Sequence, residues 1–343
     1  MFTYLVQRVF LLVPTFIGIT FIAFFVIHLA PGDPAELRAG GGLGAAGASG
    51  LATEQQSAVD QALTAWRAQY GLDQPLPVQY WHWLRNLFTL EFGDSFKDNQ
   101  PVWHKIAERI PVTIQLNIIS IVLIYLVAIP LGIYSATHSY SVGDQLTTFV
   151  AFMLFALPSF WIGTLAIVFL CGGDFLDWFP PGGLASVDYS PRWPFWQRVL
   201  DRGWHLCLPV LMQSYAGFAG LSRFMRSSML ENLRQDFVQT ARAKGLPERV
   251  VLAKHVLRNS LIPIVTILAS ILPGLMSGSV IIETIFSIPG LGQLGYEAVL
   301  ARDYPIIMAV FTISSLLTLV SILLSDFLLT VVDPRITFSG RSA

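Results

Sequence analysis

Six long stretches of the sequence contain no Asp, Glu, Lys or Arg, and they constrain the fold more than any other feature. A helix needs about 20 mostly apolar residues to cross a membrane. Only 13 % of the 343 residues are charged, whereas about a quarter are charged in a soluble domain. The stretches are Val9–Ala30, a portion of Ile110–Gly143, Gln145–Gly173, Gly203–Ser222, Asn259–Ile282 and Tyr304–Ser325. The sequence therefore predicts an all-α membrane protein with six transmembrane helices.

The first stretch could instead be a signal peptide. Val9–Ala30 is longer than a typical signal-peptide core, and Pro31 follows the small residue at its end. We therefore expect an uncleaved first span.

The placement of Lys and Arg predicts the orientation of the spans. Arg8 precedes the first span, eight Lys/Arg against three Asp/Glu lie between Arg223 and Arg258, and Arg335 and Arg341 follow the last span. The alternate loops contain more Asp/Glu than Lys/Arg. Residues 31–109 hold nine acidic and six basic residues, residues 174–202 hold four and three, and residues 283–303 hold three and one. Because cytoplasmic loops are enriched in Lys and Arg, both termini are expected in the cytoplasm.

These spans divide the chain into four parts. They are an N-terminus with the first span (1–30), an extracytoplasmic, periplasmic insert (31–109), a transmembrane core (110–331) that carries the basic loop 223–258, and a cytoplasmic tail (332–343).

The insert carries its own local signals. Gly40–Gly50 is a low-complexity tether, and Thr53 and Gln56 form a capping-box pattern that opens a helix ending at Gly71. A second helix starts near Pro77 and repeats apolar residues at helical spacing, namely Tyr80, Trp81, Leu84, Leu87 and Phe88. These aromatic residues could form a belt at the lipid headgroups or a docking surface for a soluble partner.

The basic loop is expected to form a helical hairpin over Asp236–Pro263. Gly245 suits a helix C-terminus and Pro247 the first turn of the next helix, so two short helices should break at 245–247. Val238, Ala241 and Gly245 share one face of the first helix and are small enough for a partner to approach. An apolar stripe is expected on the second helix, formed by Val250, Ala253 and Leu257. The hairpin is either an ordinary loop made basic by topology or a contact surface outside the membrane.

Several polar residues lie deep in the predicted spans, and Pro130 and Pro158 interrupt two of those spans. They are Asn117, Ser120, Ser159, Gln213 and Ser214. Such groups either hydrogen-bond one helix to another or line a substrate pathway.

Two carboxylates also lie near or inside spans. Glu283 ends the fifth span, just before a segment broken by Gly and Pro, and could cap or line a pathway. Asp326 lies about two turns before the end of the sixth span, where an ionisable group is a functional candidate. We favour a structural ion pair of Asp326 with Arg226, or with Arg223, over a proton relay.

Several common chemistries lack their signatures. Cys171 and Cys207 have no CxxC or CxxH spacing and the six histidines are scattered, so no metal site is indicated. No catalytic residues are predicted, because the sequence holds no HExxH or GxSxG motif and no phosphate-binding GxxxxGK[ST] loop. A net charge of −1 gives no reason to expect nucleic acid. If ATP drives this protein, a partner must hydrolyse it.

The basic loop resembles a known motif. Gln239, Thr240 and Ala241, three further residues and then Gly245 are similar to the EAA-xxx-G loop of permeases in binding-protein-dependent ABC importers. TARAKGL (240–246) and KHVLRN (254–259) are closer to the peptide-importer branch, in which Gln239 and Thr240 replace the Glu and Ala of the general motif.

The resemblance covers nearly the whole chain. YLVQRVFLLVPTFIGIT (4–20), APGDP (30–34), LPSFWIG (157–163), ETIFSIPGLG (283–292), ARDYP (301–305) and VDPRI (332–336) are similar to the dipeptide/oligopeptide/nickel permease family. FGDS (92–95), GGDFLDWFPPGGL (172–184), LGYEA (294–298) and VDPRITFSG (332–340) most resemble the Yej-type oligopeptide permeases, a subgroup associated with peptides and microcin C.

The resemblance implies a type I ABC importer permease in a bacterial inner membrane. Its expected partners are a second homologous permease that completes a heterodimer, two ATP-binding subunits that hold ATP and Mg, a periplasmic peptide-binding protein and membrane lipid. This chain would bind no cofactor and would not itself be an enzyme. It also implies that the loop is a coupling helix that contacts the ATPases through Asp236, Gln239, Thr240, Ala241, Lys244, Gly245 and Leu246. Pathway-lining candidates are Asn117, Ser159, Gln213, Ser214 and Glu283.

Three alternatives remain open from the sequence. The same family includes nickel and other small-solute permeases, and a metal could travel as a chelate. A proton-coupled carrier would need titratable groups in the spans, of which Asp326 is the one that qualifies. A scaffold or sensor subunit would bind partners without moving a substrate.

Overall fold

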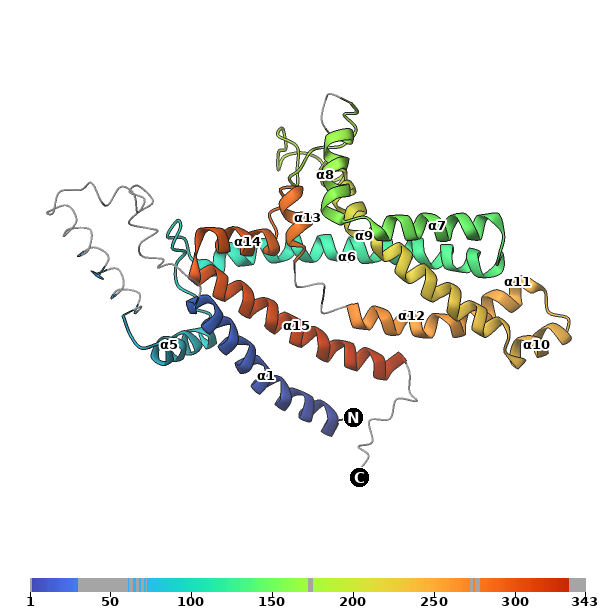
Figure 1. Ribbon diagram of the computed structural model, residues 1–343, viewed down its shortest axis with the longest axis horizontal. Helices are drawn as coiled ribbons and strands as arrows, with labels where there is room; N and C mark the ends of the chain where they lie inside the picture. The colour runs from blue at the N-terminus through green and yellow to red at the C-terminus, as the bar shows by residue number, and fades with distance from the viewer. Residues whose placement is uncertain are drawn as a thin grey trace. The chain divides into compact units, whose positions relative to one another are not determined.

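The computed structural model describes residues 2–29, 61, 64–65, 68, 71, 73–171, 175–271, 274 and 278–332. Within these ranges the regular elements are helices, and a single isolated β-bridge joins Asp94 to Pro101 (Figure 1). The predicted all-α class is confirmed for this part of the chain. The predicted tether at Gly40–Gly50, the capping box at Thr53 and Gln56, and residues 333–343 of the tail lie outside the described residues.

The chain forms two compact units. One contains Met1–Leu5, Pro111–Gln293 and Leu317–Ala343, and the other contains Val6–Ile110 and Leu294–Leu316. The division into an N-terminal span, insert, core and tail concerns placement in the membrane and stays a prediction.

Four helices are long and apolar enough to cross a membrane. They are Phe10–His28, Val102–Thr137, Glu248–Ala269 and Tyr304–Phe327. A fifth span is possible if Val142–Ala156 and Ser159–Leu170, which meet at a 97° bend, act together. The predicted stretch Gly203–Ser222 lies inside a 39-residue helix that is not among these, because polar residues such as Gln213 and Ser214 lower its apolarity. The structure thus supports a multi-pass membrane protein with four or five spans by length and composition.

The smaller unit joins α1 (Phe2–Leu29) to α5 (Leu76–Phe88). Pro75 caps α5, and the helix predicted to start near Pro77 is confirmed. The Tyr80 hydroxyl lies 3.1 Å from the Thr20 hydroxyl, and its ring packs edge-on against the buried Phe24. Trp81 and Phe88 stay largely exposed. The expected aromatic face is therefore divided between the interior of the unit and its surface.

The larger unit is built around α9 (Phe195–Leu233), against which α7 (Val142–Ala156), α8 (Ser159–Leu170) and α12 (Leu257–Ile271) pack. Most of α6 (Val102–Thr137) also belongs to this unit. Pro158 lacks an N–H and holds an extended backbone, so it ends α7 and starts α8. Beyond α12 follow α13 (Val280–Ile285), α14 (Leu291–Ala301) and α15 (Tyr304–Val332).

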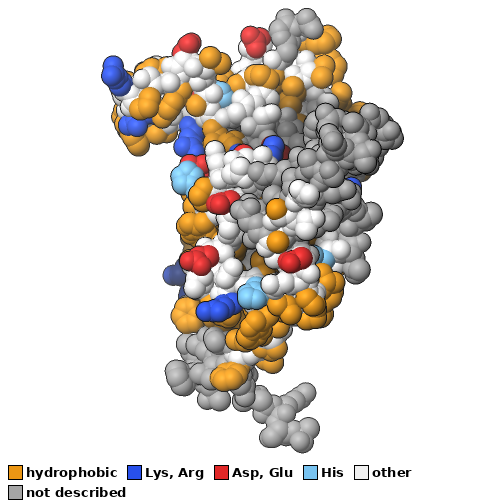
Figure 2. Space-filling view, turned by 90° about the vertical axis from the view of Figure 1, so that its left-hand side faces the viewer, with side chains coloured by type: hydrophobic (Ala, Val, Ile, Leu, Met, Phe, Trp, Pro, Cys, Tyr) orange, Lys and Arg blue, Asp and Glu red, His pale blue; other side chains and the backbone are white. Residues whose placement is uncertain are grey.

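Large apolar side chains remain exposed on the spanning helices. Leu126 on α6 is 67 % exposed and Phe149 on α7 is 64 % exposed. Hydrophobic side chains also gather over much of the described surface on the face drawn in Figure 2. In water such patches would favour association, whereas hydrocarbon solvates them, so the membrane is the natural solvent of these helices.

Candidate functional site

The basic loop forms the predicted hairpin. Helix α10 runs from Asp236 to Ala243, and Gly245 then adopts a φ of +75°, which favours glycine because it has no Cβ. Pro247 caps α11 (Glu248–Val250), so the break predicted at 245–247 is confirmed. The second helix is not short, however, because α11 continues without interruption through a π-helical turn, η1 (Val251–Val256), into α12.

The π-helical turn corrects the predicted apolar stripe. Val250 and Ala253 are exposed, whereas Val251 and Val256 are fully buried. The prediction assumed α-helical spacing of three or four residues. A π-helix instead brings residues five positions apart onto one face, which is the spacing of the two buried valines.

The first hairpin helix turns its small residues inward. Val238 and Ala241 are buried in an apolar cluster of this unit together with Met225, Val251 and Ile264. The expectation that Val238 and Ala241 offer a face to a partner is therefore wrong, since their own chain already covers them. The exposed members of the predicted set are Asp236, Gln239, Thr240, Lys244, Gly245 and Leu246. These residues form the free surface of the hairpin, and a Cβ added at Gly245 would meet nothing within 4 Å.

Polar contacts fix the hairpin at its tip and at its base. At the tip, Arg242 Nη2 and Nε donate to the Glu248 carboxylate at 2.6 and 3.2 Å, and these hydrogen bonds raise the pKa of Arg242. At the base, the hydroxyls of Ser228 on α9 and Ser260 on α12 each donate to the other residue's carbonyl oxygen, at 3.1 and 3.3 Å. The tip of the hairpin is thus closed by an ion pair, and the two helices at its base are joined to each other.

The polar residues in the predicted spans mostly connect helices. Gln213 on α9 donates through Nε2 to Asn117 Oδ1 on α6. Ser214 Oγ donates to the Ser120 carbonyl oxygen at 3.1 Å, again from α9 to α6. Ser159 is half-buried at the start of α8. These contacts match the helix-to-helix alternative, and a pathway-lining role for Asn117, Ser159, Gln213 and Ser214 stays a prediction.

Glu283 is fully buried and does not line an open surface in this conformation. Its carboxylate accepts hydrogen bonds from Thr113 Oγ1 at 3.0 Å, from the Ser279 N–H at 3.2 Å and from the Gln293 N–H at 2.8 Å. A Cβ at Gly290 would lie 2.3 Å from the Glu283 carboxyl carbon. The carboxylate therefore organises the segment broken by Gly and Pro, and the GLG sequence leaves space for it.

Arg226 pairs with a carboxylate that the sequence analysis did not single out. Its Nε and Nη2 donate to Asp144 at 3.1 and 2.9 Å, and Ser135 Oγ and the Tyr140 N–H also donate to that carboxylate. We expected Asp326 as the partner of Arg226, and its pairing with this arginine stays a prediction. The available signal was the position of Asp144, which is the one charge between two apolar windows.

The smaller unit also holds a buried carboxylate, that of Asp303. Asp303 accepts from Ser95 Oγ at 2.5 Å and from the Phe96 N–H at 3.0 Å. Two motifs noted separately in the sequence, FGDS and ARDYP, therefore meet at this residue. No local sequence signal marks this contact, because about 200 residues separate its two sides.

No group of three or more His, Cys, Asp and Glu side chains that could hold a metal occurs among the described residues. The described part of the site therefore consists of an exposed helical hairpin and buried polar anchors.

Family models match both parts of the chain. Residues 128–338 match the binding-protein-dependent transport system inner membrane component, and residues 1–117 match the N-terminal part of such membrane components. The chain belongs to the family of inner membrane permease components of binding-protein-dependent transport systems.

Individual relatives agree over nearly the full length. The oligopeptide transport system permease protein AppB of Bacillus subtilis is 38 % identical, with 98 % of this chain and 100 % of the relative covered. The peptidoglycan transport system permease protein YejB of Agrobacterium fabrum is 37 % identical, and the inner membrane ABC transporter permease protein YejB of Escherichia coli O157:H7 is 36 % identical. Both alignments cover 98 % of this chain and 99 % of the relative. The resemblance to oligopeptide and Yej-type permeases is confirmed.

Proposed function

We propose that this chain is one of two permease subunits in an ATP-driven importer that moves peptides into the cytoplasm by alternating access. Family membership supports the permease role, and the names of the relatives support a peptide substrate. The observation that carries the mechanism is the basic hairpin, which exposes one surface while its other face is built into the transmembrane helices.

The proposed topology has six spans with both termini in the cytoplasm. Four helices and the bent pair supply up to five spans, and α9 supplies the sixth because its charged residues lie near its two ends. The hairpin then lies in the cytoplasm, where two ATP-binding subunits hold ATP and Mg. The insert then lies in the periplasm, where a peptide-binding protein delivers substrate.

The hairpin can transmit force because it is packed into the helices that it would move. Val238 on α10 shares a buried cluster with Met225 on α9 and Ile264 on α12. A protein interior is close-packed and therefore transmits a displacement instead of absorbing it. A push on the exposed face of α10 by closing ATPases would thus shift α9 and α12 together. Such coupling requires that the ATPases contact the two states of the permease differently.

A matched pair of variants tests this proposal. The whole complex is purified with its second permease and ATPases, reconstituted in liposomes, and assayed for ATP hydrolysis with peptide-loaded binding protein. Thr240→Trp places bulk on the exposed face of α10 and is expected to abolish the stimulation by substrate. Tyr140→Trp, at an exposed position on the α6–α7 turn, is the control and is expected to retain stimulation.

The same assay separates the alternatives. Stimulation by a nickel chelate but not by peptide would replace the proposed substrate and keep the coupling mechanism. Uptake by the isolated chain without ATP would contradict the proposal that this chain belongs to an ATP-driven importer.

A further inference from the structure

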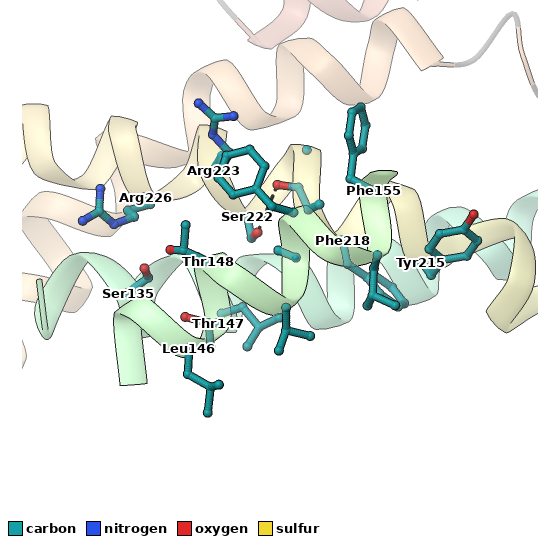
Figure 3. A pocket seen from close by; sticks show the side chains of 17 residues that line it. Ser135, Leu146, Thr147, Thr148, Phe155, Tyr215, Phe218, Ser222, Arg223 and Arg226 are labelled. Carbon is teal, nitrogen blue, oxygen red and sulfur yellow. Dashed lines mark hydrogen bonds between the residues drawn. The ribbon is translucent and has the colours of Figure 1, made fainter. Parts of the chain in front are cut away.

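A groove of about 380 Å³ lies between α6, α7 and α9 in the larger unit (Figure 3). Apolar side chains form most of its walls, among them Leu146, Phe155 and Phe218. Arg223 and Arg226 lie toward one end and Tyr215 at the other. The eleven residue steps from Tyr215 to Arg226 on α9 correspond to about 16 Å at roughly 1.5 Å per residue. The groove is therefore elongated, apolar along its length and basic at one end.

Four of the five hydroxyl groups in the walls, those of Ser135, Thr147, Tyr215 and Ser222, already donate a hydrogen bond inside the protein. Tyr215 donates to the Leu157 carbonyl oxygen at 2.7 Å, Ser222 to that of Ala219 at 3.2 Å, and Thr147 to that of Gly143 at 2.8 Å. A bound peptide would bring backbone N–H and C=O groups into walls that offer them few partners, and an unpaired polar group is costly in such surroundings. A hydrocarbon chain has no such requirement.

The two arginines differ in charge balance. Arg226 is paired with Asp144, so these two side chains add no net charge. Arg223 stacks over the Phe152 ring, with its guanidinium carbon 4.8 Å from the ring centroid, and its side chain remains exposed. Within the part of the chain that the structure describes, no carboxylate lines the groove and none pairs with Arg223. One guanidinium is thus held in place with its positive charge unbalanced.

We propose that this groove binds one anionic phospholipid, with its phosphate on Arg223 and an acyl chain along α7 and α9. Charge and shape are both complementary, because basic pockets between spanning helices bind anionic headgroups and the remaining walls are apolar. Arginine suits this role because its planar fork donates more than one hydrogen bond to a phosphate. The proposed topology enters only in assigning the lipid to the cytoplasmic leaflet.

The position of the groove implies that a bound lipid would affect transport. Its walls include α7 and α9, and α9 carries the cluster that holds the coupling hairpin. A lipid in the groove would favour the arrangement of α7 and α9 to which it binds. The ATPase rate of the complex is therefore expected to depend on anionic lipid.

The test uses the whole purified complex in nanodiscs, with phosphatidylglycerol and phosphatidylethanolamine as probes and retained lipid measured by native mass spectrometry. The wild type is expected to retain phosphatidylglycerol in preference. Arg223→Gln should weaken that preference roughly tenfold, the loss expected for one hydrogen bond to a charged group. Arg234→Gln is the matched control, since Arg234 is an exposed arginine at the C-terminal end of α9 and lies outside the groove.

A second variant tests the apolar part of the groove. Ala151→Phe fills the wall on α7 and should reduce retention of both lipids while leaving Arg223 unchanged. Equal retention by Arg223→Gln and Arg234→Gln would overturn the proposal. A photo-crosslinking residue at position 155 should capture lipid, and capture of peptide or of the second permease there would overturn it as well. All of these readouts can fail while peptide-stimulated ATP hydrolysis remains intact, so failure here is distinguishable from failure of the proposed function.

Discussion

Replacing Glu283 should destabilise the larger unit more than replacing any exposed carboxylate. Three donors converge on this buried side chain, namely Thr113 Oγ1 and the N–H groups of Ser279 and Gln293. Each buried donor that loses its acceptor costs about 1–3 kcal/mol. Glu283→Ala removes all three acceptor contacts, so we expect a loss of about 3–9 kcal/mol in the free energy of unfolding.

Two milder variants test the same hydrogen bonds if Glu283→Ala does not fold. Glu283→Gln retains one carbonyl oxygen but turns an NH₂ group toward a donor, for an expected loss of about 1–3 kcal/mol. Thr113→Val keeps the side-chain shape but removes the hydrogen bond to Glu283 and the acceptor of the Leu291 N–H, which lies 2.7 Å away. Because the two sites share a bond, their effects should not add, and a double-mutant cycle measures the coupling.

The assay is thermal unfolding of the intact purified complex. The fraction that remains folded is measured by size-exclusion chromatography of samples after heating. A loss of 1 kcal/mol lowers Tm by about 2–4 °C for chains of 150–250 residues, so Glu283→Ala should lower it by on the order of 10 °C. Glu297→Gln, on the exposed face of α14, is the control and should change stability by less than about 0.5 kcal/mol. Equal melting of Glu283→Ala and this control would refute the anchoring role of the carboxylate.

Three further predictions follow from the other anchors and from the hairpin. Arg226→Ala leaves the buried Asp144 carboxylate without its cation and should lower the free energy of unfolding by about 3 kcal/mol. This value is near the lower bound for a buried pair because Arg226 is partly exposed. In thermal unfolding, the double variant with Asp144→Asn should recover part of that stability. Asp303→Ala frees the Ser95 hydroxyl of the FGDS segment and the N–H groups of Phe96 and Lys97 directly after it, and should increase proteolysis there, whereas Asp94→Ala, at an exposed position, should not. Gly245→Trp should uncouple ATP hydrolysis from uptake in a complex that still assembles. Gly245→Asn should retain coupling, because asparagine tolerates a φ near +75°. Normal uptake by the Trp variant would contradict the coupling role of the hairpin.

The hairpin shows where sequence patterns suffice and where they fail. Gly245 and Pro247 located its break correctly, because a positive φ and a missing N–H are local requirements of the backbone. The buried face was assigned wrongly at Val238 and Ala241, because small residues suit a partner's surface and a neighbouring helix of the same chain equally well. The stripe at Val250 was misplaced because the π-helical turn has no local sequence signal comparable to glycine or proline.

The sequence by itself determined the helical membrane class, the apolar spans, the family and the presence of a basic hairpin. These properties depend on hydrophobicity, charge and backbone chemistry, which act over a few tens of residues at most. Only the tertiary structure decided that Glu283 and Asp303 are buried anchors, and that Arg226 pairs with Asp144. Those outcomes depend on which distant segments meet, and a buried carboxylate takes whichever donors the packing brings to it.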